Sequence, residues 1–145
     1  MDRRCSCPRA VREQGDCPLQ GECLASNLVY KAKVKVQGLQ DQFYLGQTSR
    51  SFKERLGNHK ASFRHARKRR DTALSEHVWD LKVQGIEYKV EWEIVRKCTT
   101  ASRREQRCQL CSEEKLQILE MMAQYPDQTI NRRTELMRVC GHQNK

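Results

Sequence analysis

The chain has 145 residues, which suits one domain with a modest core. Its 28 Lys and Arg residues outnumber 18 Asp and Glu residues, so the formal net charge is +10. This balance favours a polyanionic partner, with nucleic acid first and an anionic membrane surface second. No apolar run approaches the roughly 20 residues needed to cross a bilayer, so we expect no membrane-spanning segment.

Eight cysteines bear on the redox compartment of the protein. The first residues have no apolar stretch behind their charges and do not resemble a secretory signal. Without such a signal, many cysteines favour an intracellular, reducing location and metal binding over a disulfide framework. A secreted disulfide protein is a competing hypothesis, and the Cys-x2-Cys pair Cys108 and Cys111 on a predicted helix argues against it.

Residues 1–27 form a cysteine-rich lead-in with little apolar content and several turn residues. Its thiols are Cys5, Cys7, Cys17 and Cys23. Such a segment gains little from burial, whereas a tetrahedral zinc ion would contribute directly to its folding. We therefore predict a zinc-binding lead-in at 1–27 and a main domain at 28–145. Reduced thiols on an unstructured tail are the alternative.

The next stretch predicts a strand, a turn, a second strand and a helix. Residues 29–36 alternate, so the even-numbered side chains, Tyr30 among them, share one face, and three lysines lie on the other. Gly38 marks the turn, and residues 43–46 form a short second strand that ends at Gly46.

Residues 52–63 predict a helix with polar side chains on its apolar stripe. The apolar residues recur three or four positions apart, and Arg55 and His59 fall on the same stripe. Burying these groups is costly unless something pairs with them. The alternative is an ordinary amphipathic helix whose Arg and His heads reach water past their own stems.

A basic run follows this helix and is suited to contact with a phosphate backbone. The predicted DNA-binding residues are Arg64, Arg67, Lys68, Arg69 and Arg70. Asp71 and Thr72 then cap a second helix that extends to Lys82. Residues 88–97 alternate and predict a third strand. The predicted fold class is α+β, with a small three-stranded antiparallel sheet flanked by helices.

The longest predicted helix begins at Ser102 and places Glu114 on its inward side. Spacings of three and four residues put Glu114 on one stripe with apolar neighbours, while Glu113 points about 100° away. An inward carboxylate needs a partner. A divalent cation and a salt bridge with Arg55 are both open on this pattern.

Two further ligand pairs complement the lead-in thiols. They are Cys108 with Cys111, and Cys140 with His142. Together the eight ligands would suffice for two four-coordinate zinc ions and leave Cys98 over. We expect the lead-in to fold back on the Cys108 helix and the C-terminal tail, although spacing does not decide which pairs share an ion. Zinc ligation by His65 or His77 is the alternative.

Two tyrosines on adjacent strands, a glycine, and Arg and His on the next helix together resemble the GIY-YIG nuclease family. Leu28-Val29-Tyr30 stands where the family has Gly-Ile-Tyr, and Tyr44-Leu45-Gly46 stands where it has Tyr-Ile-Gly. Many family members carry a lysine where this chain has Gln47. The catalytic residues that the resemblance implies are Tyr30, Tyr44, Arg55, His59, Glu114 and Asn131.

The cysteines narrow the resemblance. The Cys17-to-Cys23 segment before the first half-motif, the cysteine pair before Glu114 and the N-R-R-T-E-L run from Asn131 look like the endonuclease domain of Penelope-like retrotransposons. In such elements the domain is attached to a reverse transcriptase. The resemblance therefore implies a reverse transcriptase domain in the same polyprotein, DNA as substrate, and a nuclear location.

The activity implied is metal-assisted hydrolysis of a DNA phosphodiester, which nicks target DNA and leaves a 3′-hydroxyl able to prime reverse transcription. Glu114 would hold one Mg²⁺ or Mn²⁺, and Arg55 would bind phosphate oxygens as charge builds. The base stays open between Tyr44, Tyr30 and His59, because a tyrosine needs nearby cations to lower its pKa from about 10. A zinc-containing nucleic-acid-binding module without catalysis is the competing hypothesis.

Overall fold

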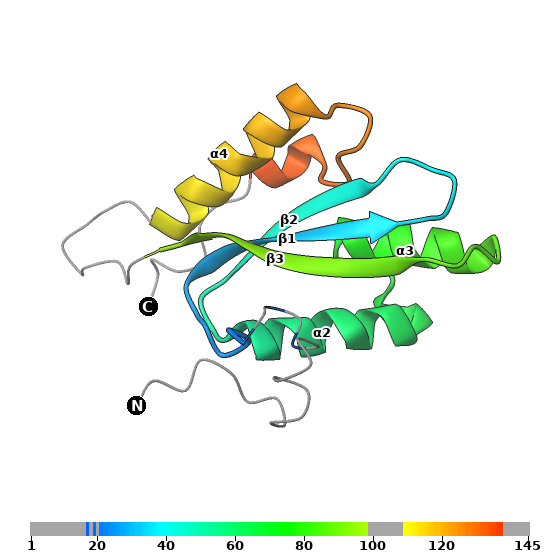
Figure 1. Ribbon diagram of the computed structural model, residues 1–145, viewed down its shortest axis with the longest axis horizontal. Coiled ribbons are helices and arrows are strands. Elements are labelled where there is room, and N and C mark those ends of the chain that lie inside the picture. The colour runs from blue at the N-terminus through cyan, green and yellow to red at the C-terminus, as the bar shows by residue number, and fades with distance from the viewer. Residues whose placement is uncertain (1–16, 18, 20, 99–108, 138–145) are drawn as a thin grey trace.

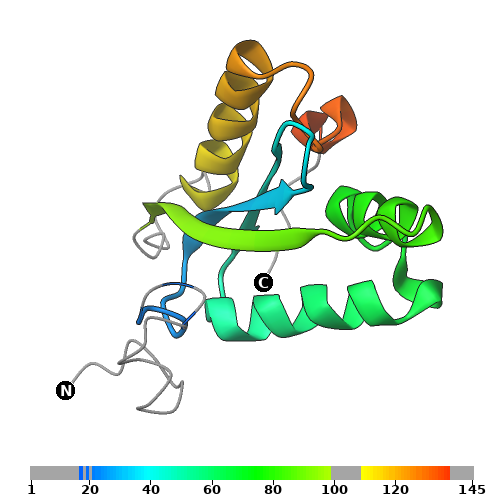
Figure 2. The same ribbon diagram turned by 45° about the vertical axis from the view of Figure 1, so that its right-hand side comes forward.

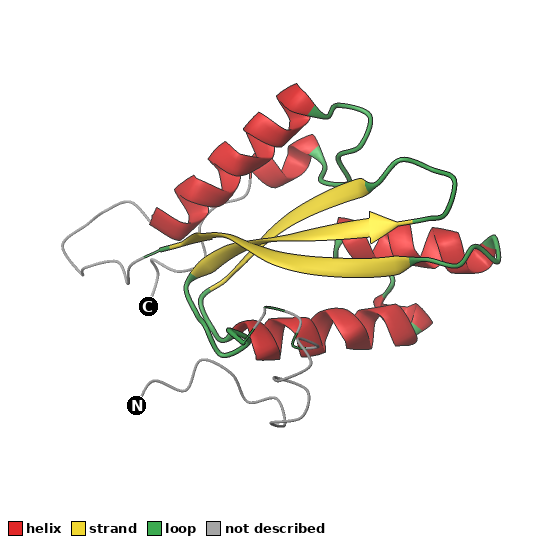
Figure 3. Ribbon diagram, viewed as in Figure 1, coloured by secondary structure: helices red, strands yellow, loops and turns green. Residues whose placement is uncertain are grey.

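The computed structural model describes residues 17, 19, 21–98 and 109–137, and its centre is a three-stranded antiparallel sheet (Figure 1, Figure 3). The strands are β1 (Leu28–Lys35), β2 (Gln42–Thr48) and β3 (Lys89–Lys97). β1 is central, with β2 and β3 paired to its two edges. The predicted antiparallel sheet is therefore confirmed.

Helices cover both faces of this sheet, as the turned view in Figure 2 makes visible. The helix α2 (Phe52–Arg64) packs with α3 (Ala73–Val83) on one face, and α4 (Gln109–Gln124) packs on the other. Two short 3₁₀ turns are η1 (Ala66–Lys68) and η2 (Arg133–Met137). The α+β class is confirmed. Among the residues the structure describes, no helix is both long and apolar enough to cross a membrane.

β1 is buried on both sides because its alternating side chains feed two separate cores. Tyr30, Ala32 and Val34 pack against α2 and α3, as the even-numbered pattern predicts. Val29 points the other way and packs with residues of α4. A slip of one residue in β1 would exchange the two cores, so its register is strongly specified.

The second strand is longer than the sequence predicts. The sequence predicts an end at Gly46, whereas β2 continues to Thr48. Pairing with β1 persists beyond the glycine, since Val29 faces Gln47 and Leu28 faces Thr48. Gly46 has no side chain to contribute to the sheet face, but its backbone still pairs with β1. Gln47 is thus fixed on a strand rather than in a loop.

The predicted helix boundaries follow from capping. The Thr72 side chain accepts a hydrogen bond from the Ser75 N–H at 3.0 Å, and the Ser75 side chain accepts one from the Thr72 N–H at 3.0 Å. These two bonds form a capping box at the start of α3. α3 ends before Gly85, whose φ of +71° lies in the left-handed region that glycine adopts at low cost.

The described residues before β1 are attached to α2 and β3. The carbonyls of Cys23 and Ala25 accept hydrogen bonds from the first turn of α2, at 2.7 and 2.9 Å. Glu22 forms an ion pair with Lys97 at the end of β3. The remaining zinc-ligand predictions and the start of the last helix lie outside the described residues; they are Cys5, Cys7, Ser102, Cys108, Cys140 and His142.

Asn131 closes the outer edge of β2. Its side-chain oxygen accepts from the Leu45 N–H at 2.7 Å, and its amide donates to the Leu45 carbonyl at 2.8 Å. The backbone of Phe43 is also paired: its N–H donates to the Gln128 carbonyl, and its carbonyl accepts from the Ile130 N–H. An amide side chain therefore replaces a strand here, and both of its ends are engaged with backbone. This geometry gives Asn131 a structural role next to the predicted site.

Asn131→Asp replaces the donating amide with a second acceptor that faces the Leu45 carbonyl. We expect a loss of about 1–3 kcal/mol in the free energy of unfolding, because a buried carbonyl loses its donor. Urea denaturation at neutral pH measures this loss. Stability equal to that of the unaltered protein would contradict the clamp.

Candidate active site

The site is built around Tyr30 and the glycine beside it. Gly46 pairs with Tyr30 across the β1–β2 ladder, and the tyrosine ring lies over it. A Cβ built on Gly46 would come within 2.5 Å of Tyr30 Cζ, a distance that no real side chain adopts. Any other residue at 46 would therefore displace the tyrosine.

Two α2 side chains meet the Tyr30 hydroxyl. Arg55 Nε donates to it at 3.0 Å, and His59 Nε2 lies 2.5 Å away. Because Arg55 can only donate, the hydroxyl accepts from it, and we assign its own proton to a hydrogen bond with His59 Nε2, which supplies the buried hydroxyl with an acceptor. His59 is then the tautomer with its proton on Nδ1. Arg55 and His59 can therefore lie on the inner side of α2 because both are hydrogen-bonded to the Tyr30 hydroxyl.

His59 is enclosed and neutral. It is 1% exposed, and its ring lies against those of Tyr44, Phe63 and Trp92. Burial, and then the positive charge of Arg55, lower the pKa of His59 to about 3 from its ordinary 6.5. The imidazole therefore keeps a lone pair available throughout the neutral pH range.

The pKa values of both tyrosines are raised, which is opposite to what a tyrosine base requires. Burial raises the pKa of Tyr30 to about 12, and the opposing effect of Arg55 is smaller. Burial also raises the pKa of Tyr44 well above its usual 10. Arg55 lowers the pKa of both tyrosines, as a nearby cation should, but burial outweighs it in each case. Tyr30 is a proton donor here, and His59 is its acceptor.

Glu114 belongs to α4, which packs on the other face of the sheet, and it acts on this site through its charge. Its carboxylate accepts from Gln47 Nε2 at 3.3 Å, and the same amide nitrogen lies 3.5 Å from Cys111 Sγ. The charge of Glu114 raises the pKa of Tyr30, Tyr44 and Arg55. The prediction that Glu114 faces inward is confirmed. Its neighbour Glu113 instead contacts Gln117 and Arg96, at 3.0 and 3.6 Å.

Sequence reasoning missed a second carboxylate. Glu135 in η2 is 6% exposed and accepts from the Arg132 N–H at 2.9 Å. Its charge also raises the pKa of Tyr30 and Tyr44. A polar run such as N-R-R-T-E-L gives no periodic signal of burial. Gln47 was noted only as a departure from the family pattern, although it holds the predicted acid.

The carboxylates at this site suit a hard divalent cation. Mg²⁺ binds through one or two carboxylates and takes its other ligands from water and substrate phosphates. Glu114 fits that description, with Glu135 in the same neighbourhood. Within the described ranges, no three His, Cys, Asp or Glu side chains are grouped as metal ligands.

The predicted zinc ligands fall in two places. Cys17 and Cys23 are buried together with Leu24 beside the start of α2. Cys111 belongs to the core under α4 instead. The structure brings two lead-in thiols together, but it does not join them to Cys111. With their other predicted partners outside the described ranges, zinc binding stays a prediction.

The predicted DNA-binding cations are on the surface. Arg64, Arg67, Arg69 and Arg70 are exposed, and Lys68 is half-buried. His65 is exposed and ends α2, whereas His77 is half-buried on α3. Burial lowers the pKa of His77. Neither histidine belongs to a metal-ligand group among the described residues.

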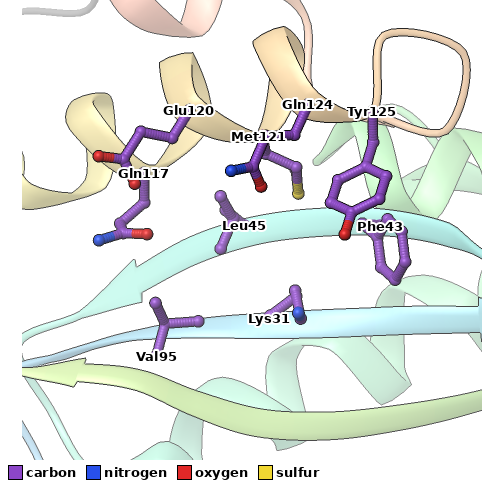
Figure 4. Close-up of a pocket in the computed structure, with 9 residues that line it drawn as sticks. All are labelled: Lys31, Phe43, Leu45, Val95, Gln117, Glu120, Met121, Gln124 and Tyr125. Carbon is purple, nitrogen blue, oxygen red and sulfur yellow. The ribbon is translucent and has the colours of Figure 1, made fainter.

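A separate pocket of about 120 Å³ lies on the face of the sheet that α4 covers, opposite the face that carries Tyr30 (Figure 4). It is between β2 and α4. Phe43 and Tyr125 flank one end, with ring centres 5.3 Å apart, and Lys31 lies over Phe43. None of the predicted catalytic side chains lines this pocket. The candidate active site is therefore the polar cluster at Tyr30 and not this hollow.

Neither a family model, a curated protein nor a solved structure matches the chain. The GIY-YIG resemblance thus depends on the motif residues and on their arrangement. Four of the six predicted catalytic residues, Tyr30, Tyr44, Arg55 and His59, are in contact in one cluster. Glu114 acts on this cluster through its charge, and Asn131 supports the strand beside it.

His59→Gln keeps an acceptor for the Tyr30 hydroxyl and removes the titrating imidazole. Between a folded pKa of about 3 and an unfolded value of 6.5, only the unfolded state binds the His59 proton. Stability should therefore fall as pH drops through this window, by up to about 1.4 kcal/mol per pH unit. Urea unfolding at pH 7 and pH 4.5 should show a smaller fall in the variant. Equal falls in both proteins would contradict a buried, neutral His59.

Proposed function

We propose that the chain is a divalent-metal-dependent DNA endonuclease of the GIY-YIG type. The observation that carries the proposal is the hydrogen-bonded series Arg55–Tyr30–His59, on which the carboxylate of Glu114 acts electrostatically from α4. Folding alone gains little from burying these polar groups, since apolar side chains of similar size would pack without desolvation cost. A net charge of +10 suits a polyanionic substrate.

The proposed reaction is attack of water on a phosphodiester. A bond forms between the water oxygen and phosphorus, and the bond from phosphorus to the 3′ oxygen breaks. Arg55 binds nonbridging phosphate oxygens as negative charge grows in the transition state. A bound Mg²⁺ or Mn²⁺ held by Glu114 would neutralise charge on the phosphate and the departing oxygen.

Tyr30 and His59 would take the proton from the water. As the water loses its proton to the Tyr30 hydroxyl, that hydroxyl passes its own proton to His59 Nε2. An anionic phosphate beside Arg55 offsets the positive charge that lowers the pKa of His59, which makes the imidazole a better acceptor. Tyr44, whose ring lies against His59, would orient the water.

The biological setting is part of the same proposal. The product would be a nick with a free 3′-hydroxyl that primes reverse transcription. Such a role places the domain in the nucleus, joined to a reverse transcriptase in one polyprotein. Structural zinc would be held by the cysteine-rich lead-in, where Cys17 and Cys23 are already buried together.

Glu114→Gln should lower nicking of supercoiled plasmid roughly 100-fold or more, because the metal ligand loses its charge. DNA binding and zinc content should stay the same. Glu113→Gln is the matched control, since it removes a neighbouring carboxylate that faces Gln117 instead. We expect it to nick at the normal rate in Mg²⁺ or Mn²⁺.

Three other outcomes would contradict different parts of the proposal. Equal nicking by the Glu114 variant would mean that another carboxylate, or a contaminant, is responsible. No nicking by the unaltered protein, together with tight salt-sensitive binding, would favour the zinc-containing binding module. Loss of nicking in both variants would point to damage of α4 rather than to metal binding.

A further inference from the structure

The outer side of α2 carries a row of cations. Lys53, Lys60 and Arg64 are all exposed. With 100° between successive residues, these positions and Gly57 fall within an arc of about 60°. The row is about 16 Å long at 1.5 Å per residue. It leads directly into the exposed arginines of the basic run that follows α2.

This row contains no carboxylate. The nearest acid on the helix, Glu54, lies outside the arc and forms an ion pair with Arg50 at 3.7 Å. The apolar side chains of α2 face the sheet, as the burial of Phe52, Leu56 and Phe63 requires. A helix that lies in a membrane surface would instead present apolar side chains outward. The outer side of α2 therefore suits an aqueous polyanion.

Gly57 lies in the middle of this row and has no packing reason to be glycine. Nothing within the described part of the chain comes within 4 Å of a Cβ built there. Glycine in a helix interior costs about 1 kcal/mol relative to alanine. Glycine also lets a bound molecule approach the backbone closely. A ligand that touches the helix backbone would account for both facts.

The row is separate from the candidate active site. Arg55 points about 170° away from the centre of the arc, toward Tyr30 on the sheet. In Figures 1 and 2, α2 lies below the sheet, so one side of it meets the core and its outer side faces away. A ligand on the row would contact the protein without touching the reacting groups.

We propose that the phosphate backbone of duplex DNA lies along the outer side of α2, with its closest approach at Gly57. This proposal rests on the proposed function only for the nature of the ligand. DNA carries one negative charge per about 1.7 Å of helix axis, so a row of this length faces several phosphates. The surface contributes affinity and leaves the chemical step unchanged.

The test measures binding of a labelled duplex in the Glu114→Gln background over a salt series. Gly57→Gln adds a side chain at the closest approach, whereas Asn58→Gln adds one methylene to an exposed amide about 130° around the helix from the centre of the row. Gly57→Gln should melt at a higher temperature yet bind roughly three- to tenfold more weakly, whereas Asn58→Gln should bind normally. The opposed changes in stability and affinity separate a lost contact from misfolding.

Charge removal gives an independent measurement. Lys60→Gln should weaken binding and lower the magnitude of the salt slope by about 0.9, while Lys89→Gln on β3 should leave both unchanged. With Glu114 intact, single-turnover nicking at saturating protein should be normal in the Gly57 and Lys60 variants. A slower saturated rate would contradict a surface separate from the active site.

Failure of this inference can be told apart from failure of the proposed function. If the duplex binds and neither the Gly57 nor the Lys60 variant weakens it, the surface is wrong and the nuclease proposal stands. If the protein binds no duplex at any salt concentration, both fail. Preferential binding to anionic vesicles that Lys60→Gln abolishes would replace DNA with a membrane as the ligand.

Discussion

The hydrogen bonds from Arg55 to Tyr30 and from Tyr30 to His59 determine how the rest of the structure is arranged. A guanidinium, a phenol and an imidazole are costly to bury, and each is accommodated because the next one satisfies it. Tyr30 can reach both α2 side chains only because Gly46, beside it on β2, has no side chain. Asn131 then clamps the outer edge of that strand.

The parts of the fold that were predictable are those with a strong period. Alternation in β1 separates Tyr30 from Val29, and spacings of three and four residues put Arg55 and His59 on the buried side of α2. Both periods come from backbone geometry and survive into the packed structure. The pattern does not fix where pairing stops, which is why β2 extends past Gly46 to Thr48.

The parts that were missed depend on contacts between distant segments. Gln47 meets Glu114 across 67 positions, and Glu135 acts on Tyr30 from the last described turn. Nothing local distinguishes these side chains from ordinary polar surface. The raised pKa of Tyr30 belongs with these contacts, because the helix spacing reveals its charged neighbour Arg55 but not the extent of its burial.

The most direct measurement compares Tyr30→Phe with the unaltered protein in both urea unfolding and plasmid nicking. The substitution removes one hydroxyl and keeps the ring that packs on Gly46 and Phe52. The account predicts a loss of about 1–3 kcal/mol in stability and, in folded protein, a fall of roughly 100-fold or more in nicking. Normal nicking by the folded variant would contradict it, because the hydroxyl would then serve packing alone.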